Sequence, residues 1–231
     1  MSIDVKNLTV SYGSKKALDD FSFDFTEGKV YVVLGPNGCG KSTLVKAIVD
    51  KYAKGNIAYV AQETLGIINL TVREYVELGR YNPKKFFGGL NSVDVKKVED
   101  AISIMQLNEL EDRLFDTLSG GEKQRAMAAR CLCQDAPWII LDEPSSSLDV
   151  KHTRLILNIV RNLCDKENKS FIIVLHDIND AVKYADKILL MKDGKLIKET
   201  DLLTTEDLAS IFDTQFKCIN SDEGSSYFYA L

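Results

Sequence analysis

A glycine-rich turn between a buried strand and a helix is the feature that most constrains this chain. Residues 29–34 read KVYVVL, a continuous apolar run that is typical of a strand buried on both faces. The segment 35–42 reads GPNGCGKS, and 43–50 have the spacing of a helix. A strand of this kind needs a layer of structure over each face, which favours an α/β sheet. The turn matches G-x-x-x-x-G-K-[ST] in the strand–turn–helix context that makes this pattern informative.

The turn has the chemistry of a phosphate site. Glycines let successive backbone N–H groups point toward phosphate oxygens, and the start of the following helix adds its positive end. Lys41 can reach the β- and γ-phosphates, and Ser42 can offer its hydroxyl to Mg²⁺. The alternative is a turn that only caps a helix, and the motif by itself indicates no more than a nucleoside triphosphatase. The expected nucleotide contacts are Gly35, Pro36, Asn37, Gly38, Cys39, Gly40, Lys41, Ser42 and Thr43.

An acidic pair follows a second apolar strand, WIIL at 138–141. Asp142 and Glu143 emerge at its carboxyl end, which in an open α/β sheet is the edge where ligands bind. We expect Asp142 to hold Mg²⁺, directly or through water, and Glu143 to polarise the attacking water as a general base. Acidic pairs at strand ends are common, so this interpretation depends on the phosphate turn in the same chain.

The rest of the sequence predicts further strands that would form a larger sheet with the strand at 29–34. Residues 3–10 and 21–25 alternate apolar and polar positions, as half-buried antiparallel strands do. Strands at 56–61 and 170–175, with helices between the buried strands, indicate a parallel α/β sheet. Further expected elements are helices at 150–164 and 178–185, a hairpin about Asp193 and Gly194, and a short helix with two weak strands after 204.

A helical insertion is expected between two strands of that sheet, because 65–118 show almost no strand pattern. Thr71 and Glu74 form a capping box that begins a helix, and further helices are expected at 92–106 and from Ser119 to about 134. We expect a single domain in which 1–64 and 135–231 form the α/β core with its antiparallel strands and about 65–134 form the helical subdomain.

Composition excludes several other classes. The 231 residues suit one globular domain, and a net charge of -5 with interspersed signs does not predict a nucleic-acid surface. No apolar run approaches the roughly 18–20 residues that span a bilayer, and the N-terminus lacks a signal pattern. The 5 cysteines form no CxxC pair, and only 2 histidines occur, which argues against a structural zinc site. We expect a reduced cytoplasmic protein whose membrane role, if any, comes through a partner.

The segment LSGGEKQR at 118–125 narrows the family. Locally, Ser119 and Glu122 form a capping box, and a helix start with two glycines and a hydroxyl is also an anion site. Together with the phosphate turn and the Asp-Glu pair, the segment resembles the ABC ATPase family over essentially the whole chain. The resemblance implies a P-loop NTPase with an ABC-type RecA-like core, an N-terminal antiparallel β-subdomain, an inserted helical subdomain, and ATP as the nucleotide.

The resemblance also assigns roles to residues outside these motifs. Tyr12, in the loop after the first strand, matches the aromatic residue that stacks on adenine. Gln62, directly after strand 56–61, matches the glutamine that senses Mg²⁺ and the attacking water. His176, after strand 170–175, matches the switch histidine that contacts the γ-phosphate. The matching D-loop residues, which cross to the other subunit, are Ser147, Leu148 and Asp149, although Asp149 could equally cap the next helix.

Partners follow from the same resemblance. In this family two ATP-binding subunits sandwich two ATPs head to tail, so that the signature residues of one copy serve the nucleotide of the other. The signature residues here are Leu118, Ser119, Gly120, Gly121 and Glu122. We expect a homodimer on the inner face of the cell membrane, attached through permease subunits, with an extracytoplasmic substrate-binding protein as an indirect partner. Without tandem ABC domains or a coiled coil, the translation and chromosome classes do not fit.

Two stretches, 71–102 and 174–196, are similar to importer ATPases for iron–siderophore, haem and cobalamin. The alternatives are a soluble iron–sulfur assembly ATPase and a zinc or manganese importer ATPase, which shares the pattern around Gly79. One departure is the short path from Asp50 to Asn56, where most relatives carry an extra hairpin, so a trimmed antiparallel subdomain is expected. His152 matches no motif and is expected to be a solvated helix residue.

Overall fold

The computed structural model describes residues 2–53, 55–61, 68–81, 89–144, 150–220 and 226–231. A central sheet organises the fold, and its first five strands in spatial order run parallel whereas the last is antiparallel. The predicted α/β class is therefore correct. In spatial order the strands are β4 (Ile57–Val60), β5 (Trp138–Asp142), β6 (Ser170–Val174), β3 (Val30–Leu34), β7 (Lys187–Lys192) and β8 (Lys195–Thr200).

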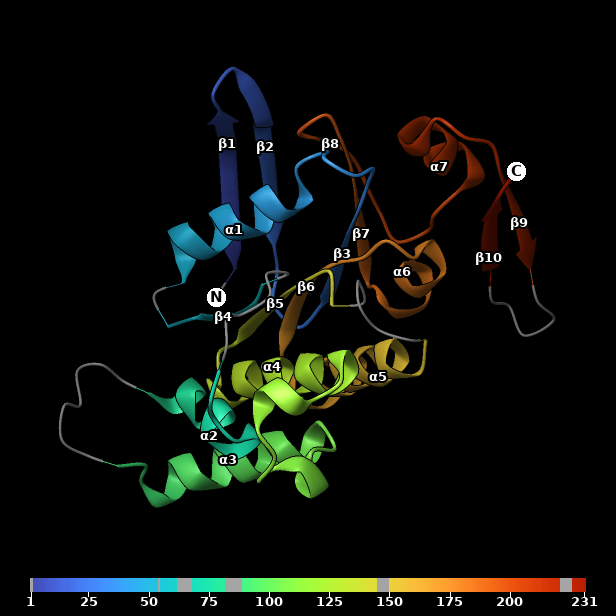
Figure 1. Ribbon diagram of the computed structural model, residues 1–231. Coiled ribbons are helices and arrows are strands. Elements are labelled where there is room, and N and C mark those ends of the chain that lie inside the picture. The colour runs from blue at the N-terminus through green and yellow to red at the C-terminus, as the bar shows by residue number, and fades with distance from the viewer. Residues whose placement is uncertain (1, 54, 62–67, 82–88, 145–149, 221–225) are drawn as a thin grey trace.

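Both faces of the sheet are covered, which explains the continuous apolar strands (Figure 1). All five residues of β3 are buried, because alternate side chains enter two separate cores. Tyr31 and Val33 pack with Leu44 and Ile48 of helix α1 (Lys41–Tyr52). The opposite side packs against α5 (Val150–Glu167), α6 (Ile178–Tyr184) and α7 (Thr205–Phe212).

The N-terminal hairpin covers the α1 side. It joins β1 (Ile3–Tyr12) to β2 (Lys15–Phe25) in a two-stranded antiparallel sheet. Both strands are longer than predicted, because Gly13 at φ 60° permits a tight turn directly after Tyr12. Tyr12 therefore ends a strand and pairs with Lys15, so the prediction that it lies in a loop is wrong. The chain passes from α1 to β4 without the extra hairpin, as its length predicts.

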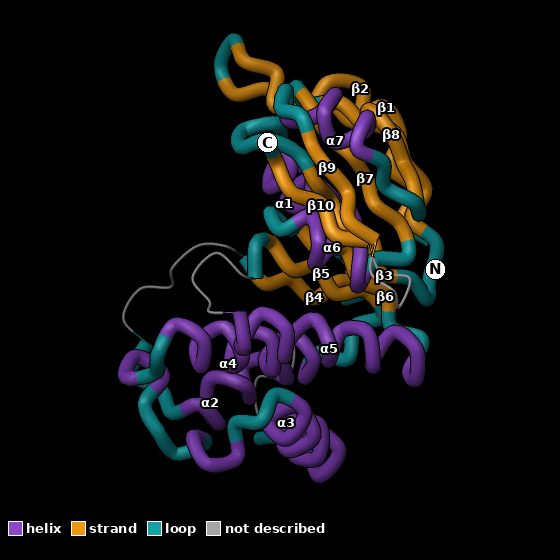
Figure 2. Tube along the Cα trace, turned by 90° about the vertical axis from the view of Figure 1, so that its right-hand side faces the viewer, coloured by secondary structure: helices purple, strands orange, loops and turns teal. Residues whose placement is uncertain are grey.

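Helices α2, α3 and α4 gather at one end of the molecule, away from β1, β2 and β8 (Figure 2). Their own apolar core includes Tyr75, Ile102 and Phe115, so this part packs largely on itself. Capping boxes at Thr71, Asn91 and Ser119 begin the three helices. The bounds are α2 (Val72–Glu77), α3 (Ser92–Ile104) and α4 (Gly120–Cys133), with short 3₁₀ turns at Leu78–Arg80, Asn108–Leu110 and Phe115–Thr117.

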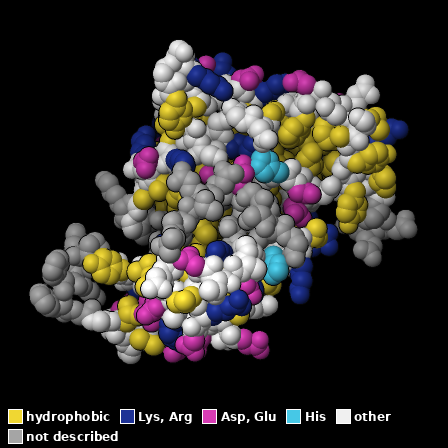
Figure 3. Space-filling model, in the orientation of Figure 1, with side chains coloured by type: hydrophobic (Ala, Val, Ile, Leu, Met, Phe, Trp, Pro, Cys, Tyr) yellow, Lys and Arg dark blue, Asp and Glu magenta, His cyan; other side chains and the backbone are white. Residues whose placement is uncertain are grey.

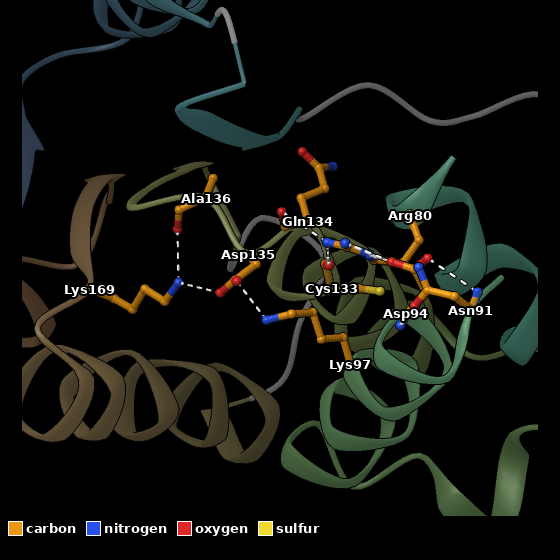
Figure 4. A network of polar contacts seen from close by, with 9 residues as sticks. All are labelled: Arg80, Asn91, Asp94, Lys97, Cys133, Gln134, Asp135, Ala136 and Lys169. Atoms are coloured by element: carbon orange, nitrogen blue, oxygen red, sulfur yellow. Dashed lines mark hydrogen bonds and ion pairs between the residues drawn. The ribbon is translucent and has the colours of Figure 1, made fainter. Parts of the chain in front are cut away.

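A polar network connects these helices to the sheet (Figure 4). Asp135, after the end of α4, accepts hydrogen bonds from Lys97 of α3 at 2.6 Å and from Lys169 beside β6 at 2.9 Å. Arg80 donates to Asp94 at 2.8 Å and to the Cys133 carbonyl at 3.0 Å. Two ion pairs on one carboxylate thus link a helix of the inserted segment to a strand of the sheet.

A C-terminal hairpin completes the fold beside α6 (Figure 1). Strand β9 (Phe216–Asn220) pairs antiparallel with β10 (Ser226–Ala230), as the two weak strand patterns predict. The Asn179 side chain of α6 bonds the backbone of Phe228 twice, donating at 3.1 Å and accepting at 2.7 Å. The hairpin is therefore fixed to the helix that follows His176.

Candidate nucleotide-binding site

The glycine-rich turn leads from the end of β3 to the start of α1, and neighbouring backbone holds it in place. A side chain at Gly35 would collide with the Met191 carbonyl, and one at Gly40 with the Ala17 carbonyl. Gly40 is also at φ 107°, a conformation that L side chains rarely adopt. The Gly194 amide donates to the Cys39 carbonyl at 2.9 Å, so a hydrogen bond joins the turn between β7 and β8 to the glycine-rich turn.

Lys41 is held inside this turn. Its ammonium donates to the carbonyl oxygens of Gly35 at 2.8 Å and Pro36 at 3.0 Å, and the residue is only 5% exposed. Gly40 precedes α1 without a side-chain cap, so the first amides of that helix lack the usual side-chain acceptor. A cation beside a helix N-terminus is an arrangement that binds phosphate oxygens.

Ser42 and Asp142 are brought together from distant parts of the sequence. The Ser42 hydroxyl donates to Oδ1 of Asp142 at 3.1 Å, and the Tyr59 hydroxyl donates to Oδ2 at 3.3 Å. Asp142 is 1% exposed, and burial raises the pKa of its carboxyl above the ordinary value, with a further rise from Glu143. A hydroxyl and a carboxylate at this spacing offer the oxygen donors that Mg²⁺ prefers.

Glu143 faces His176 at the adjoining strand end. The Nε2 atom of His176 lies 2.8 Å from Oε1 of Glu143. Glu143 has φ 51°, a left-handed conformation that costs energy for a side chain of this size and is enriched at functional sites. The sheet register therefore brings together two residues that the sequence assigned separately to catalysis.

These elements line one pocket. Tyr12, at 63% exposed, stands on its rim, with its ring accessible for stacking. Lys15 and Ala17, which were not predicted, also contribute, because the tight turn after Tyr12 folds β2 back over the glycine-rich turn. The pocket is lined by Tyr12, Lys15, Ala17, Asn37, Gly38, Gly40, Lys41, Ser42, Thr43 and Glu143.

The predicted signature residues lie elsewhere. None of 118–122 is among the described residues that line the pocket. Ser119 caps α4 by accepting from the Glu122 amide at 3.4 Å, and Glu122 accepts from the Ser119 amide at 2.8 Å. That backbone hydrogen bond lowers the pKa of Glu122. Leu118 and Gly121 are buried, whereas Ser119 and Gly120 are exposed at the helix tip.

Two predicted groups lie outside the described residues, namely Gln62 and the D-loop residues Ser147, Leu148 and Asp149. His152, in contrast, is placed, and the prediction that it is solvated is wrong. It is half-buried, and its ring lies directly against Gly121. Tyr59 was also not predicted, since only its position beside β5 reveals its contact with Asp142.

Charged side chains of both signs are interspersed on the face that Figure 3 shows, and histidine side chains lie on it.

No described helix is long and apolar enough to cross a membrane. Within the described ranges, no cluster of three or more histidine, cysteine or acidic residues has the arrangement of a metal site.

Comparison with known proteins agrees with this geometry. The family model described as "ABC transporter" matches residues 18–146. The Petrobactin import ATP-binding protein YclP of Bacillus subtilis (strain 168) is 33% identical over 236 residues, covering 91% of this chain and 92% of the relative. A structure described as an inward-facing conformation of a metal-chelate type ABC transporter has a TM-score of 0.86 and 27% identity, covering 99% of this chain and 96% of that chain.

A further solved structure is a dimeric ATP-binding cassette in a post-hydrolysis state bound to ADP and Pi. Its TM-score is 0.75 at 26% identity, and the match covers 88% of this chain and 100% of that chain. The matched region of the family model includes the glycine-rich turn, the segment 118–125 and the Asp142–Glu143 pair. Sequence, fold and site geometry thus agree that this chain belongs to the ABC transporter family, as a subunit that binds and hydrolyses ATP.

Proposed function

We propose that two copies of this chain hold two ATPs between them, and that hydrolysis powers the import of a metal chelate through a separate permease. The observation that carries the proposal is the separation of two anion-binding elements. Lys41 and Ser42 line one pocket, whereas the Ser119 end of α4 lies outside it in the same chain. A second copy placed head to tail would bring that helix end onto the triphosphate.

Glu143, His176 and Lys41 are the residues proposed to carry out hydrolysis. Glu143 accepts a proton from water as the water oxygen bonds to the γ-phosphorus, and the bond to the bridging oxygen breaks to release ADP. His176, 2.8 Å from Glu143, holds that carboxylate in one orientation and reaches toward the γ-phosphate. Lys41 balances negative charge on the β- and γ-oxygens. Overall, ATP and water become ADP and phosphate.

Magnesium is part of the proposal. The adjacent oxygens of Ser42 and Asp142 fit a hard divalent cation, and Gln62 is the proposed further ligand. When bound there, such an ion would neutralise negative charge on the phosphate oxygens. The mixed donors and the buried carboxylate support magnesium over a softer metal.

The permease is proposed to dock beside the helical segment. In our proposed division, 1–64 and 135–231 form the α/β core, and about 65–134 form the helical subdomain. Leu78 begins the short 3₁₀ turn and Tyr81 follows it, and both side chains are exposed within the docking region proposed near Gln62–Tyr81. An exposed apolar pair of this kind suits a helix of a membrane partner. The chain would then lie on the cytoplasmic side, peripheral to the membrane.

The proposed cargo class rests on the relatives. One is named for petrobactin import, and one solved structure is described as metal-chelate type. An iron–siderophore, haem or cobalamin complex, delivered by an extracytoplasmic binding protein, is therefore the proposed cargo. A zinc or manganese importer ATPase and a soluble ATPase of the iron–sulfur assembly type are the competing functions.

Membrane purification separates these functions. The tagged protein is purified from native membranes in mild detergent, and its partners are identified by mass spectrometry. The proposal predicts a multispanning permease in stoichiometric amount. Purification without any permease would favour the soluble class, whereas a permease encoded beside a zinc- or manganese-binding protein would favour that importer class.

A variant of the helix tip tests the shared site. Ser119→Arg should abolish most ATP hydrolysis without unfolding the monomer, because the bulky side chain blocks approach of the partner's nucleotide. Thr204→Arg is the matched control, since Thr204 caps α7 with an equivalent capping box to Asp207. Equal loss in both variants would show that lost capping, rather than the signature position, explains the effect.

A further inference from the structure

His152 and Gly121 form a contact that neither the glycine-rich turn nor the catalytic pair accounts for. Gly121 is the second residue of α4, and His152 is the third residue of α5. A Cβ added at Gly121 would lie 2.8 Å from Cγ, 3.0 Å from Nδ1 and 3.1 Å from Cδ2 of His152. Three ring atoms at these distances mean that the imidazole covers the Cα atom of Gly121.

This contact gives a physical reason for glycine at position 121. The backbone there is not in the left-handed region, so conformation alone does not require glycine. Glycine in a helix is less stable than alanine, so its presence calls for a compensating reason. The reason here is space, because the missing side chain would point at His152 within the same chain. The need for glycine therefore arises inside the subunit rather than at its outer surface.

The position of the contact connects it to the proposed function. Gly121 lies two residues after Ser119, whose hydroxyl and helix tip are proposed to meet the nucleotide of the partner copy. The described part of α5 begins at Val150, two residues before His152, and α4 lies beside α5 in both views (Figures 1 and 2). The ring therefore lies where the starts of two helices meet, next to the exposed tip of α4.

We propose that His152 is a positioning residue, whose flat ring sets the place of the α4 tip so that Ser119 reaches the partner's triphosphate. This inference rests on the proposed function, because it assigns His152 to the shared site. The half-buried ring acts by its shape against Gly121. The expected consequence of its loss is weaker ATP-driven dimerisation, with ATP binding by the single subunit preserved.

A double-mutant cycle tests this in the full chain carrying Glu143→Gln, with dimerisation measured by sedimentation in Mg-ATP. We expect Gly121→Ala to weaken dimerisation about tenfold or more, and His152→Ala to weaken it less. In the His152→Ala background, adding Gly121→Ala should change the dissociation constant by no more than about twofold, because the clash is gone. An equal effect of Gly121→Ala in both backgrounds would overturn the inference.

Two further measurements keep the outcomes distinct. His152→Gln, whose planar amide has a similar reach, should dimerise within about threefold of the parent, whereas loss equal to His152→Ala would contradict a role of shape. Thermal unfolding without nucleotide is measured for the parent, Gly121→Ala, His152→Ala and the double variant. Here too, Gly121→Ala should lower the melting temperature less in the His152→Ala background than in the parent. A parent that stays monomeric in Mg-ATP would overturn the proposed function, and with it the positioning role, while the unfolding cycle would still report on the packing.

Discussion

Nε2 of His176 lies 2.8 Å from Oε1 of Glu143, at the ends of the adjacent strands β6 and β5. Glu143 directly follows β5, and His176 lies two residues after the end of β6, with both strands buried in the sheet. The strand register therefore places the imidazole against the carboxylate. In the proposed mechanism, His176 orients the Glu143 carboxylate toward the attacking water.

His176→Ala should lower kcat for ATP hydrolysis about 100-fold, the lower end of what a positioned acid–base group contributes. The dissociation constant for ATP should stay close to the parental value, because the groups proposed to hold the phosphates, Lys41 and the N-terminus of α1, do not include His176. Single-turnover phosphate release and equilibrium binding of a fluorescent ATP analogue measure the two quantities. Hydrolysis at the parental rate would remove His176 from the proposed machinery.

Asp142→Asn should stabilise the folded protein while it removes Mg-dependent hydrolysis. Burial raises the pKa of Asp142, so the ionised carboxylate opposes folding, and this cost grows as the pH rises through the raised pKa. Asparagine keeps an oxygen for the Ser42 hydroxyl but carries no charge. We expect a higher melting temperature by roughly 2–4 °C at pH 8 without nucleotide or metal, and a difference that shrinks as the pH falls toward the ordinary carboxyl pKa. An unchanged or lower melting temperature at pH 8 would contradict this assignment.

The Asp135 carboxylate should stabilise the junction between the helical segment and the sheet. Burial alone would raise its pKa, but hydrogen bonds from Lys97 and Lys169 outweigh burial and hold the pKa below the ordinary value. Asp135→Asn keeps a residue that tolerates the local φ of 58° and should lower the unfolding free energy by about 1 kcal/mol at pH 7. Because the pKa is lowered, this contribution is lost as the pH falls through the folded pKa.

Asp213→Asn is the control for that variant. Asp213 also has a left-handed φ, of 53°, but it pairs with one lysine and its side chain is 78% exposed against 49% for Asp135. Its loss should cost no more than about 0.5 kcal/mol. Urea unfolding of both variants at pH 7 makes the comparison. Equal losses would show that the paired lysines at Asp135 add nothing.

Most of the strand and helix pattern could be predicted because its signals are local. The apolar run of β3 and the capping box at Ser119 each lie within a few residues, and the structure shows both elements. The sequence predicts Tyr12 in the loop directly after the first strand. In the structure β1 continues to Tyr12, because the tight turn begins only at Gly13. Local signals also indicated Lys41, Ser42 and Asp142, although not their contacts.

The missed relationships all depend on tertiary packing. Tyr59 reaches Asp142 only because β4 pairs with β5 in a register that places Tyr59 opposite Ile140. The hydrogen bond from the Gly194 amide to the Cys39 carbonyl joins two turns that are distant in sequence. His152 was predicted to be solvated because nothing in the helix pattern indicates that α4 lies against it. Long-range register of this kind carries no local signature.

The thiols should differ sharply in reactivity. Burial raises the pKa of Cys39, and it raises those of Cys131 to about 12 and Cys133 to about 11, whereas Cys218 is exposed on β9. Native protein should therefore show one fast-reacting thiol with a disulfide reagent, and Cys218→Ser should remove that phase. A fast phase that survives in Cys218→Ser would show that a buried thiol, such as Cys39 in the glycine-rich turn, becomes accessible.

Glu143→Gln gives the most direct test of a shared ATP site. This variant should bind ATP but not hydrolyse it, so Mg-ATP should convert it from single copies to dimers in light-scattering measurements of molar mass. ADP should leave it monomeric, and adding Ser119→Arg should prevent the ATP-driven dimer. A Glu143→Gln protein that binds ATP yet remains a single copy with Mg-ATP, alone and with its membrane partners, would contradict the account.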